Sequence, residues 1–130
     1  MTPATAPAAP TILVIEDYSD TREMLCLMLR KKGYDVIEAE DGLKGLVQAR
    51  SRFPDLIIMD LALPEMDGIE TARRIHETPE LTHIPIFAVS GYLTKDVQSD
   101  VHLAGCVEMF SKPYDFESLL ESISVTLGLR

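Results

Sequence analysis

The sequence predicts an α/β fold in which one five-stranded parallel sheet is covered by helices on both faces. Two observations lead to this prediction. Five short apolar runs have the length of strands, and longer segments with apolar residues at helical spacing separate them. Strands that are apolar on both faces and joined through single helices form parallel sheets with right-handed crossovers.

The strands are expected at five runs rich in Ile, Val and Phe: 11–15 (TILVI), 34–39 (YDVIEA), 55–60 (DLIIMD), 84–89 (IPIFAV) and 106–110 (CVEMF). Helices are expected after each strand, where apolar residues recur three or four positions apart. These residues are, helix by helix, Met24, Leu25, Met28, Leu29; Leu43, Leu46, Val47; Ile69, Ala72, Ile75; Val97, Val101, Ala104; and Phe116, Leu119, Leu120, Ile123, Leu127. Gly33 and Gly105 stand where the first and fourth helices should end.

Five strands alternating with five helices give a doubly wound (βα)5 arrangement, for which the flavodoxin-like strand order 2-1-3-4-5 is the common solution. In such sheets the functional crevice lies at the carboxyl ends of the strands, beside the first strand. The residues at those ends are therefore the candidates for function.

Composition limits the function classes. The chain has 130 residues and a formal net charge of −9, which describes one soluble acidic domain. This charge, without any basic run, repels phosphate backbones and anionic lipids, so we expect a protein partner and no direct contact with nucleic acid or membrane. With neither a signal peptide nor an apolar span in the sequence, we expect a cytoplasmic protein.

The first ten residues, MTPATAPAAP, carry three prolines and four alanines and are expected to form a disordered tail before a domain at 11–130. Cys26 and Cys106 lie in apolar company and are expected to be reduced core thiols. The three histidines, His76, His83 and His102, lack the spacing of a zinc site and are expected on the surface.

Polar side chains follow the expected strands where each strand ends: Glu16 and Asp17 after the first, Asp60 at the end of the third, Ser90 after the fourth, and Lys112-Pro113 after the fifth. Carboxylates crowded together repel each other unless a cation enters. Oxygen ligands of this kind suit Mg2+. With such an ion beside it, Asp60 could attack phosphorus, while Lys112 and Ser90 contact the phosphoryl oxygens.

Four segments, in this order, resemble the receiver domain of two-component response regulators: IEDYSDTREML, IIMDLALPEMDGIE, IFAVSGY and FSKPYDFESLL. The likeness runs from about Thr11 to Leu127 and points to single-domain members similar to chemotaxis regulators. The string at 60–68, with a downstream Ser and a Lys-Pro pair, is highly specific to this family.

The resemblance implies the role of each site residue. Asp60 would be the phosphoacceptor, with Glu16, Asp17 and the backbone carbonyl of Ala62 completing the Mg2+ ligands. We expect Asp17 to bind the ion directly and Glu16 to act through water. Ser90 would be the switch hydroxyl.

Lys112 would take the family's lysine position, and the peptide between it and Pro113 is typically cis in the family. Pro64, Gly68 and Gly91 would shape the loops around Asp60, and Asp67 could cap the third helix.

Two positions depart from the family pattern. Met109 stands three residues before Lys112, where the family usually has an aromatic switch residue, and Phe110 lies beside it. Methionine is flexible enough to fill a pocket but has no ring. The acidic pair is Glu-Asp in place of the commoner Asp-Asp.

These features predict a signalling switch and not a classical enzyme: it catalyses only its own phosphorylation and dephosphorylation. The donor would be a sensor histidine kinase or a histidine phosphotransfer protein, and the fourth helix, fifth strand and fifth helix would meet a downstream protein target. We expect a monomer or a weak, phosphorylation-dependent dimer. The kinase, target and phosphoaspartate lifetime stay open.

Other interpretations are a degenerate receiver acting as a scaffold without phosphorylation, or a receiver excised from a hybrid protein, against which the start Met1-Thr2 argues mildly. An aspartyl phosphohydrolase would need an acid at position 62, where Ala62 stands. A flavin carrier would need a phosphate-binding loop after the first strand, where the sequence is the acidic EDYSD.

Overall fold

Strands and helices alternate strictly along the chain in the computed structural model, which describes residues 9–63 and 66–129. The elements are β1 (Thr11–Ile15), α1 (Ser19–Lys31), β2 (Asp35–Ala39), α2 (Gly42–Arg52), β3 (Leu56–Asp60), α3 (Gly68–Glu77), β4 (Ile86–Ser90), α4 (Lys95–Leu103), β5 (Glu108–Ser111) and α5 (Phe116–Thr126). Each element expected from the sequence is present.

The strands form one parallel sheet in the order β2-β1-β3-β4-β5, as the sequence predicts. Ile15, at the end of β1, pairs with Ala39 on one side and Met59 on the other. Farther along the sheet, Ser90 pairs with Ser111. The strand ends therefore lie level at one edge of the sheet.

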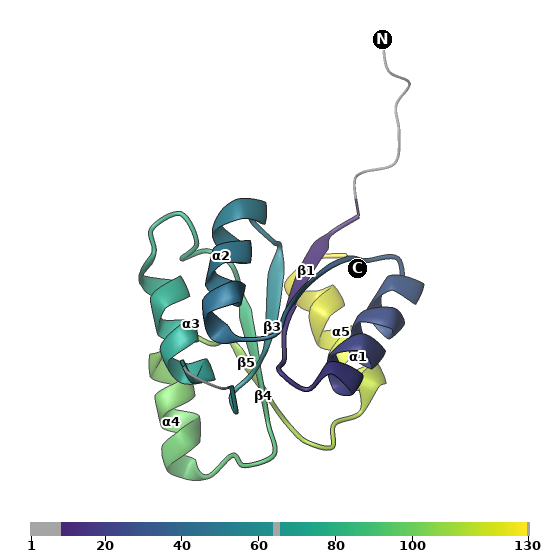
Figure 1. The fold of residues 1–130 in the computed structure, drawn as a ribbon. Helices are drawn as coiled ribbons and strands as arrows, with labels where there is room; N and C mark the ends of the chain where they lie inside the picture. The colour runs from purple at the N-terminus through teal and green to yellow at the C-terminus, as the bar shows by residue number, and fades with distance from the viewer. Residues whose placement is uncertain (1–8, 64–65, 130) are drawn as a thin grey trace.

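Helices cover both faces of the sheet. Figure 1 shows α1 and α5 on one side and α2, α3 and α4 on the other. Two buried apolar clusters match these layers, and β3, buried along its whole length, contributes side chains to both. Among the described residues no helix is both long enough and apolar enough to cross a membrane.

The thiols and histidines lie as expected. Cys26 and Cys106 are free and buried, in clusters on opposite faces of the sheet, and burial raises the pKa of each thiol to about 12. His76, His83 and His102 are exposed. The cysteines are thus inert core residues.

Element boundaries differ from the expected ones by one or two residues. β4 begins at Ile86 because Pro85 has no backbone N–H for the ladder, and β5 is displaced to Glu108–Ser111. Gly33 and Gly105 adopt positive φ values of 96° and 100° after α1 and α4, as the stop signals predict. Of the tail expected at 1–10, residues 1–8 lie outside the described residues, and the carbonyl of Pro10 already accepts a hydrogen bond from Asp35 N.

Candidate functional site

The polar side chains at the strand ends come together at one edge of the sheet. Glu16 follows β1, Asp60 ends β3 and Ser90 ends β4, and these residues are only 6%, 6% and 7% exposed. Lys112 follows β5 directly and is half-buried. Four residues from four parallel strands thus meet at the edge where a doubly wound sheet places its functional crevice.

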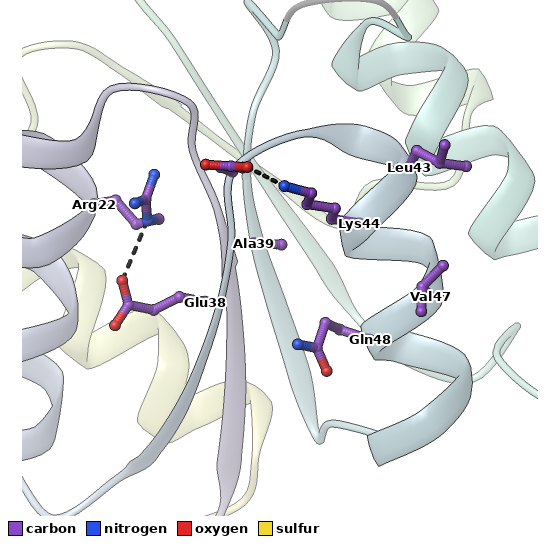
Figure 2. Close-up of a pocket in the computed structure, with 8 residues that line it drawn as sticks. Arg22, Glu38, Ala39, Leu43, Lys44, Val47 and Gln48 are labelled. Carbon is purple, nitrogen blue, oxygen red and sulfur yellow. Dashed lines mark hydrogen bonds and ion pairs between the residues drawn. The ribbon is translucent and has the colours of Figure 1, made fainter.

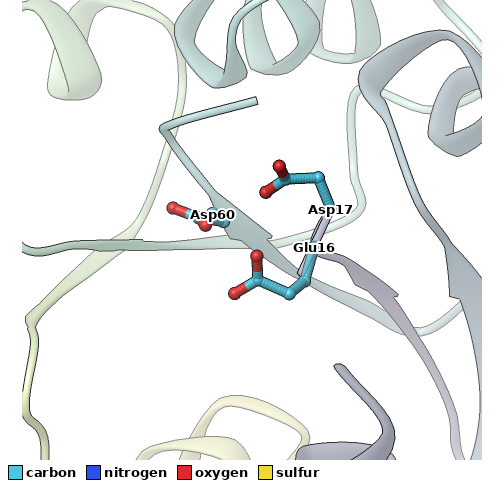
Figure 3. A group of neighbouring side chains, drawn as sticks. All are labelled: Glu16, Asp17 and Asp60. Carbon is cyan, nitrogen blue, oxygen red and sulfur yellow. The ribbon is translucent and has the colours of Figure 1, made fainter. Parts of the chain in front are cut away.

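Three carboxylates form an acidic cluster within this site. Each of Glu16, Asp17 and Asp60 offers an oxygen, and these atoms lie within 4.8 Å of one another (Figure 3). Glu16 and Asp60 are buried, whereas Asp17 is exposed. Among residues 9–63 and 66–129 this is the single group of His, Cys, Asp or Glu close enough to hold a metal ion. Its all-oxygen donor set fits a hard divalent cation that keeps some of its water.

Lys112 joins the two buried carboxylates. Its Nζ donates to Oε1 of Glu16 and to Oδ2 of Asp60, both at 3.3 Å. Burial pushes the pKa of this ammonium down, but the negative charges of Asp60 and Glu16 and their hydrogen bonds raise it above the ordinary value. Lys112 therefore stays charged and places one positive charge beside the acidic cluster.

The surroundings of Glu16 disfavour the ionised form of its carboxyl group. Burial is the largest cause that raises its pKa to about 7, and the hydrogen bond and charge of Asp60 add to it. The backbone N–H of Tyr18, which donates to Oε2 at 3.1 Å, and the charge of Lys112 act in the opposite direction. A cation in the cluster would favour the ionised form, which again fits a metal site.

Local backbone contacts orient Asp60. Its Oδ1 accepts a hydrogen bond from Ala62 N at 3.1 Å, while Oδ2 accepts the bond from Lys112. Ser90 Oγ accepts from Tyr92 N at 3.0 Å, a contact within its own loop. The described contacts of Asp60 thus fix both carboxylate oxygens.

The loop after β3 depends on a close approach at Gly68. A Cβ at this position would lie 2.6 Å from the carbonyl oxygen of Asp60, so a larger residue could not stand there without moving the backbone. Asp67 caps α3 by accepting from Glu70 N at 2.8 Å, as expected. Pro64 lies outside the described residues. Gly91 faces open space, because a Cβ at this position would meet nothing within 4 Å.

Met109 and Phe110 lie on opposite faces of β5. Met109 packs against the cluster under α2, α3 and α4, together with Leu93 and Val97. Phe110 packs on the α1 and α5 side, with its ring centroid 5.6 Å from that of Phe87. Of the two, only Met109 packs against the buried cluster that Leu93 and Val97 also contact.

The peptide between Lys112 and Pro113 is cis, as the resemblance implies. The next residue, Tyr114, lines a cavity of about 20 Å³ together with Glu16, Asp60 and Lys112. A space of this size holds about one water molecule. Burial raises the pKa of the Tyr114 hydroxyl.

Sequence reasoning missed Arg22 and Tyr114. The Arg22 guanidinium donates to the backbone carbonyl of Glu16 at 2.9 Å. Its second partner, Glu38, is 16 positions away on β2, so no local spacing indicates the pair. The signal available for Tyr114 was its place directly after the Lys-Pro pair.

Comparison with known proteins identifies the relatives of this chain. A family model described as response regulator receiver domain matches residues 12–124. The polar-differentiation response regulator DivK of Brucella ovis is 32% identical over 118 residues, which covers 91% of this chain and 96% of that protein. The DivK of Brucella anthropi shows the same identity and coverage.

Solved structures show the same fold. Chemotaxis protein CheY4 of Vibrio cholerae superimposes with a TM-score of 0.87 at 25% identity, covering 92% of this chain and 99% of that one. A putative response regulator from Chloroflexus aurantiacus gives a TM-score of 0.86 at 28% identity, covering 92% and 98%.

Proposed function

The chain belongs to the response regulator receiver domain family, and from this premise we propose that it is a signalling switch that accepts a phosphoryl group on Asp60. The observation that carries the proposal is the placement of Asp60. Its carboxylate is buried at the end of β3, inside the acidic cluster, with Oδ2 3.3 Å from Lys112 Nζ.

The transfer takes the phosphoryl group from a phosphohistidine on a partner protein. A carboxylate oxygen of Asp60 forms a new P–O bond as the P–N bond breaks, and the histidine imidazole leaves and takes up a proton. Lys112 Nζ, already 3.3 Å from Oδ2, supplies positive charge beside the incoming oxygens. Ser90 Oγ, at the end of the neighbouring strand, supplies a hydroxyl donor.

Glu16, Asp17, Asp60 and the carbonyl of Ala62 would hold Mg2+ at this site, with Asp17 as a direct ligand and Glu16 acting through water. The chemistry that bound Mg2+ supplies is neutralisation of charge on the transferring group, the chief requirement of phosphoryl transfer. Three oxygen donors within 4.8 Å of one another support this proposal. The raised pKa of Glu16 also supports it, because burial and the charge of Asp60 disfavour a second carboxylate charge there unless a cation binds.

The modified Asp60 would bias two states of the segment after Ser90. Met109 of β5 would couple to this segment through the buried cluster against which Met109, Leu93 and Val97 all pack. The surface formed by α4, β5 and α5 would then meet a downstream protein target, in the cytoplasm, with the chain as a monomer or a weak dimer. The net charge of −9 favours a protein partner over nucleic acid.

Intact-mass measurement tests the proposal. The chain is incubated with acetyl phosphate and Mg2+, beside Asp60→Asn and a sample with chelator in place of Mg2+. We expect one added phosphoryl group on the parent chain only, and only with Mg2+. Absence of the added mass, under conditions that label a known receiver, would contradict the proposal and leave a scaffold without phosphorylation as the surviving interpretation.

A further inference from the structure

Arg22 contacts the acidic cluster through the backbone carbonyl of Glu16, not through a carboxylate. It lies in α1, one turn from the helix start, and its side chain is only 14% exposed. Its Nη1 donates to the carbonyl oxygen of Glu16 at 2.9 Å, and its Nε donates to Oε1 of Glu38 at 3.2 Å. One planar guanidinium therefore joins the backbone after β1 to a side chain of β2.

The carbonyl that Arg22 holds belongs to the peptide between Glu16 and Asp17. Glu16 N still follows the sheet pattern, because it donates to Ala39 O at 3.0 Å, but β1 has ended by then. The contact with Arg22 holds the carbonyl of the same residue, so both backbone polar groups of Glu16 have a partner. Since a peptide unit is planar, fixing its oxygen also fixes the direction in which the chain enters Asp17.

The guanidinium is itself held in place. Glu38 receives a second ion pair from Arg30, at 3.3 Å from Oε2, and Arg30 also donates to Val36 O at 3.2 Å. Figure 2 shows the Arg22 and Glu38 pair among the residues that line a hollow beside α2. The volume of this hollow is about 500 Å³. The Arg22 pair uses Oε1 of Glu38 and the Arg30 pair uses Oε2, so the two contacts are separate.

We propose that Arg22 is a positioning residue for the metal site: through the Glu16 carbonyl it sets how the Glu16 and Asp17 carboxylates face a divalent cation. The inference rests on the proposed function, because it assigns to Arg22 a part in the Mg2+ site described there. Outer partners that orient metal ligands change metal affinity by about 10- to 100-fold when they are removed.

Mg2+ affinity of the full chain, measured by calorimetric titration at pH 8, tests this role directly. For Arg22→Ala we expect affinity at least about tenfold weaker than that of the parent. The variant should fold, because removal of the Arg22 side chain, which lines the adjoining hollow, leaves room for water to bond the freed Glu16 carbonyl. Arg22→Lys keeps the charge but replaces the planar fork, in which Nη1 and Nε reach separate acceptors, with one compact ammonium, and we expect at least about threefold weaker binding.

Arg30→Ala is the matched control. It removes the same charge, from the same helix and from the same carboxylate, but does not touch the Glu16 carbonyl. We expect its Mg2+ affinity to stay within about twofold of the parent, as for other exposed ion pairs. Urea unfolding of all the variants separates loss of affinity from loss of stability, and Arg22→Lys decides the matter if Arg22→Ala is unfolded.

Two results would overturn the positioning role of Arg22 and leave the proposed function standing. One is Mg2+ affinity of the Arg22 variants equal to that of the parent, and the other is an equal loss of Mg2+ affinity in Arg30→Ala. Failure of the parent chain itself to bind Mg2+ would contradict the proposed function, and the positioning role with it. The parent titration thus distinguishes the two failures.

Discussion

Lys112 Nζ lies 3.3 Å from Oδ2 of Asp60, although 52 positions separate the two residues in the sequence. The contact crosses the end of β4, because β4 stands between β3 and β5 in the sheet. Ser90 ends that middle strand, so the Lys112 ammonium, the Ser90 hydroxyl and the Asp60 carboxylate line one edge. A phosphoryl group on Asp60 would therefore lie close to the Lys112 ammonium and the Ser90 hydroxyl.

Replacing Lys112 with Met should destabilise the chain when no metal is present. The substitution leaves Glu16 and Asp60 without the cation that bonds both. We expect the free energy of unfolding at pH 8 to fall by about 1–2 kcal/mol, less than for a fully buried pair because the Lys112 side chain is 34% exposed. Urea unfolding in chelator measures the change.

Lys44→Met is the control, because it breaks the exposed ion pair with Glu40. Its effect should stay within about 0.5 kcal/mol. An equal loss in the two variants would show that Lys112 contributes no more than a surface charge.

Glu16 should make stability decline with rising pH. Its pKa in the folded chain is about 7, against the ordinary 4.5, so between these values the folded state binds the proton and the unfolded state has lost it. The contribution of Glu16 to the free energy of unfolding is therefore fully present below about pH 4.5. It is lost as the pH rises through about 7. The difference between the two pKa values corresponds to roughly 3 kcal/mol.

Urea unfolding of the parent and Glu16→Gln across this pH range, in chelator, measures the effect. The variant should gain stability relative to the parent as the pH rises, because glutamine cannot ionise. A constant difference between the two proteins from pH 4.5 to 8 would contradict the raised pKa of Glu16.

Gly68→Ala should disturb the site through the backbone. The added Cβ would meet the Asp60 carbonyl oxygen at 2.6 Å and Leu61 Cα at 2.5 Å, so the loop after β3 must shift. We expect a loss of about 1–3 kcal/mol in unfolding free energy and slower labelling by acetyl phosphate. Gly91→Ala, whose Cβ meets nothing within 4 Å, should leave stability nearly unchanged. Similar losses in both variants would refute the close-approach explanation.

Met109 should respond to phosphorylation of Asp60. It packs against the same buried cluster as Leu93 and Val97, which follow Ser90 along the chain, so a rearrangement there should change its surroundings. We expect the 13C-methyl NMR signal of Met109 to shift when acetyl phosphate and Mg2+ are added. Met28, which lies on α1 beside Phe116, should shift less. An unmoved Met109 signal on a labelled chain would rule out this route of coupling.

The sequence was sufficient to predict the sheet and the residues at its strand ends. Runs such as LIIMD are apolar on both faces, which indicates a buried parallel strand, and chain order then places Asp60 and Lys112 at one edge. Helical spacing of apolar residues predicted the helices, but it did not predict which of these side chains are buried. Leu43 and Val47 fit the spacing but are 55% and 57% exposed, because α2 packs through Gly42, Gly45, Leu46 and Ala49 instead.

Contacts made through the backbone could not be predicted. Arg22 donates to a backbone carbonyl oxygen, and every residue has one, so the sequence does not indicate which carbonyl Arg22 bonds. The orientation of Glu16 toward Lys112 depends on how far burial extends past β1, which spacing does not reveal. The division of roles between Glu16 and Asp17 stays a prediction, although the exposure of Asp17 leaves it open to an ion with bound water.

The most direct test of the central claim identifies the residue that carries the phosphoryl group. An acyl phosphate on aspartate is reduced by borohydride to homoserine, which peptide mass spectrometry locates. After incubation with acetyl phosphate and Mg2+, we expect homoserine at position 60 and none in Asp60→Asn. Homoserine at Asp17 or another carboxylate, or added phosphate on a histidine such as His76, would contradict the assignment of Asp60 as the phosphoacceptor.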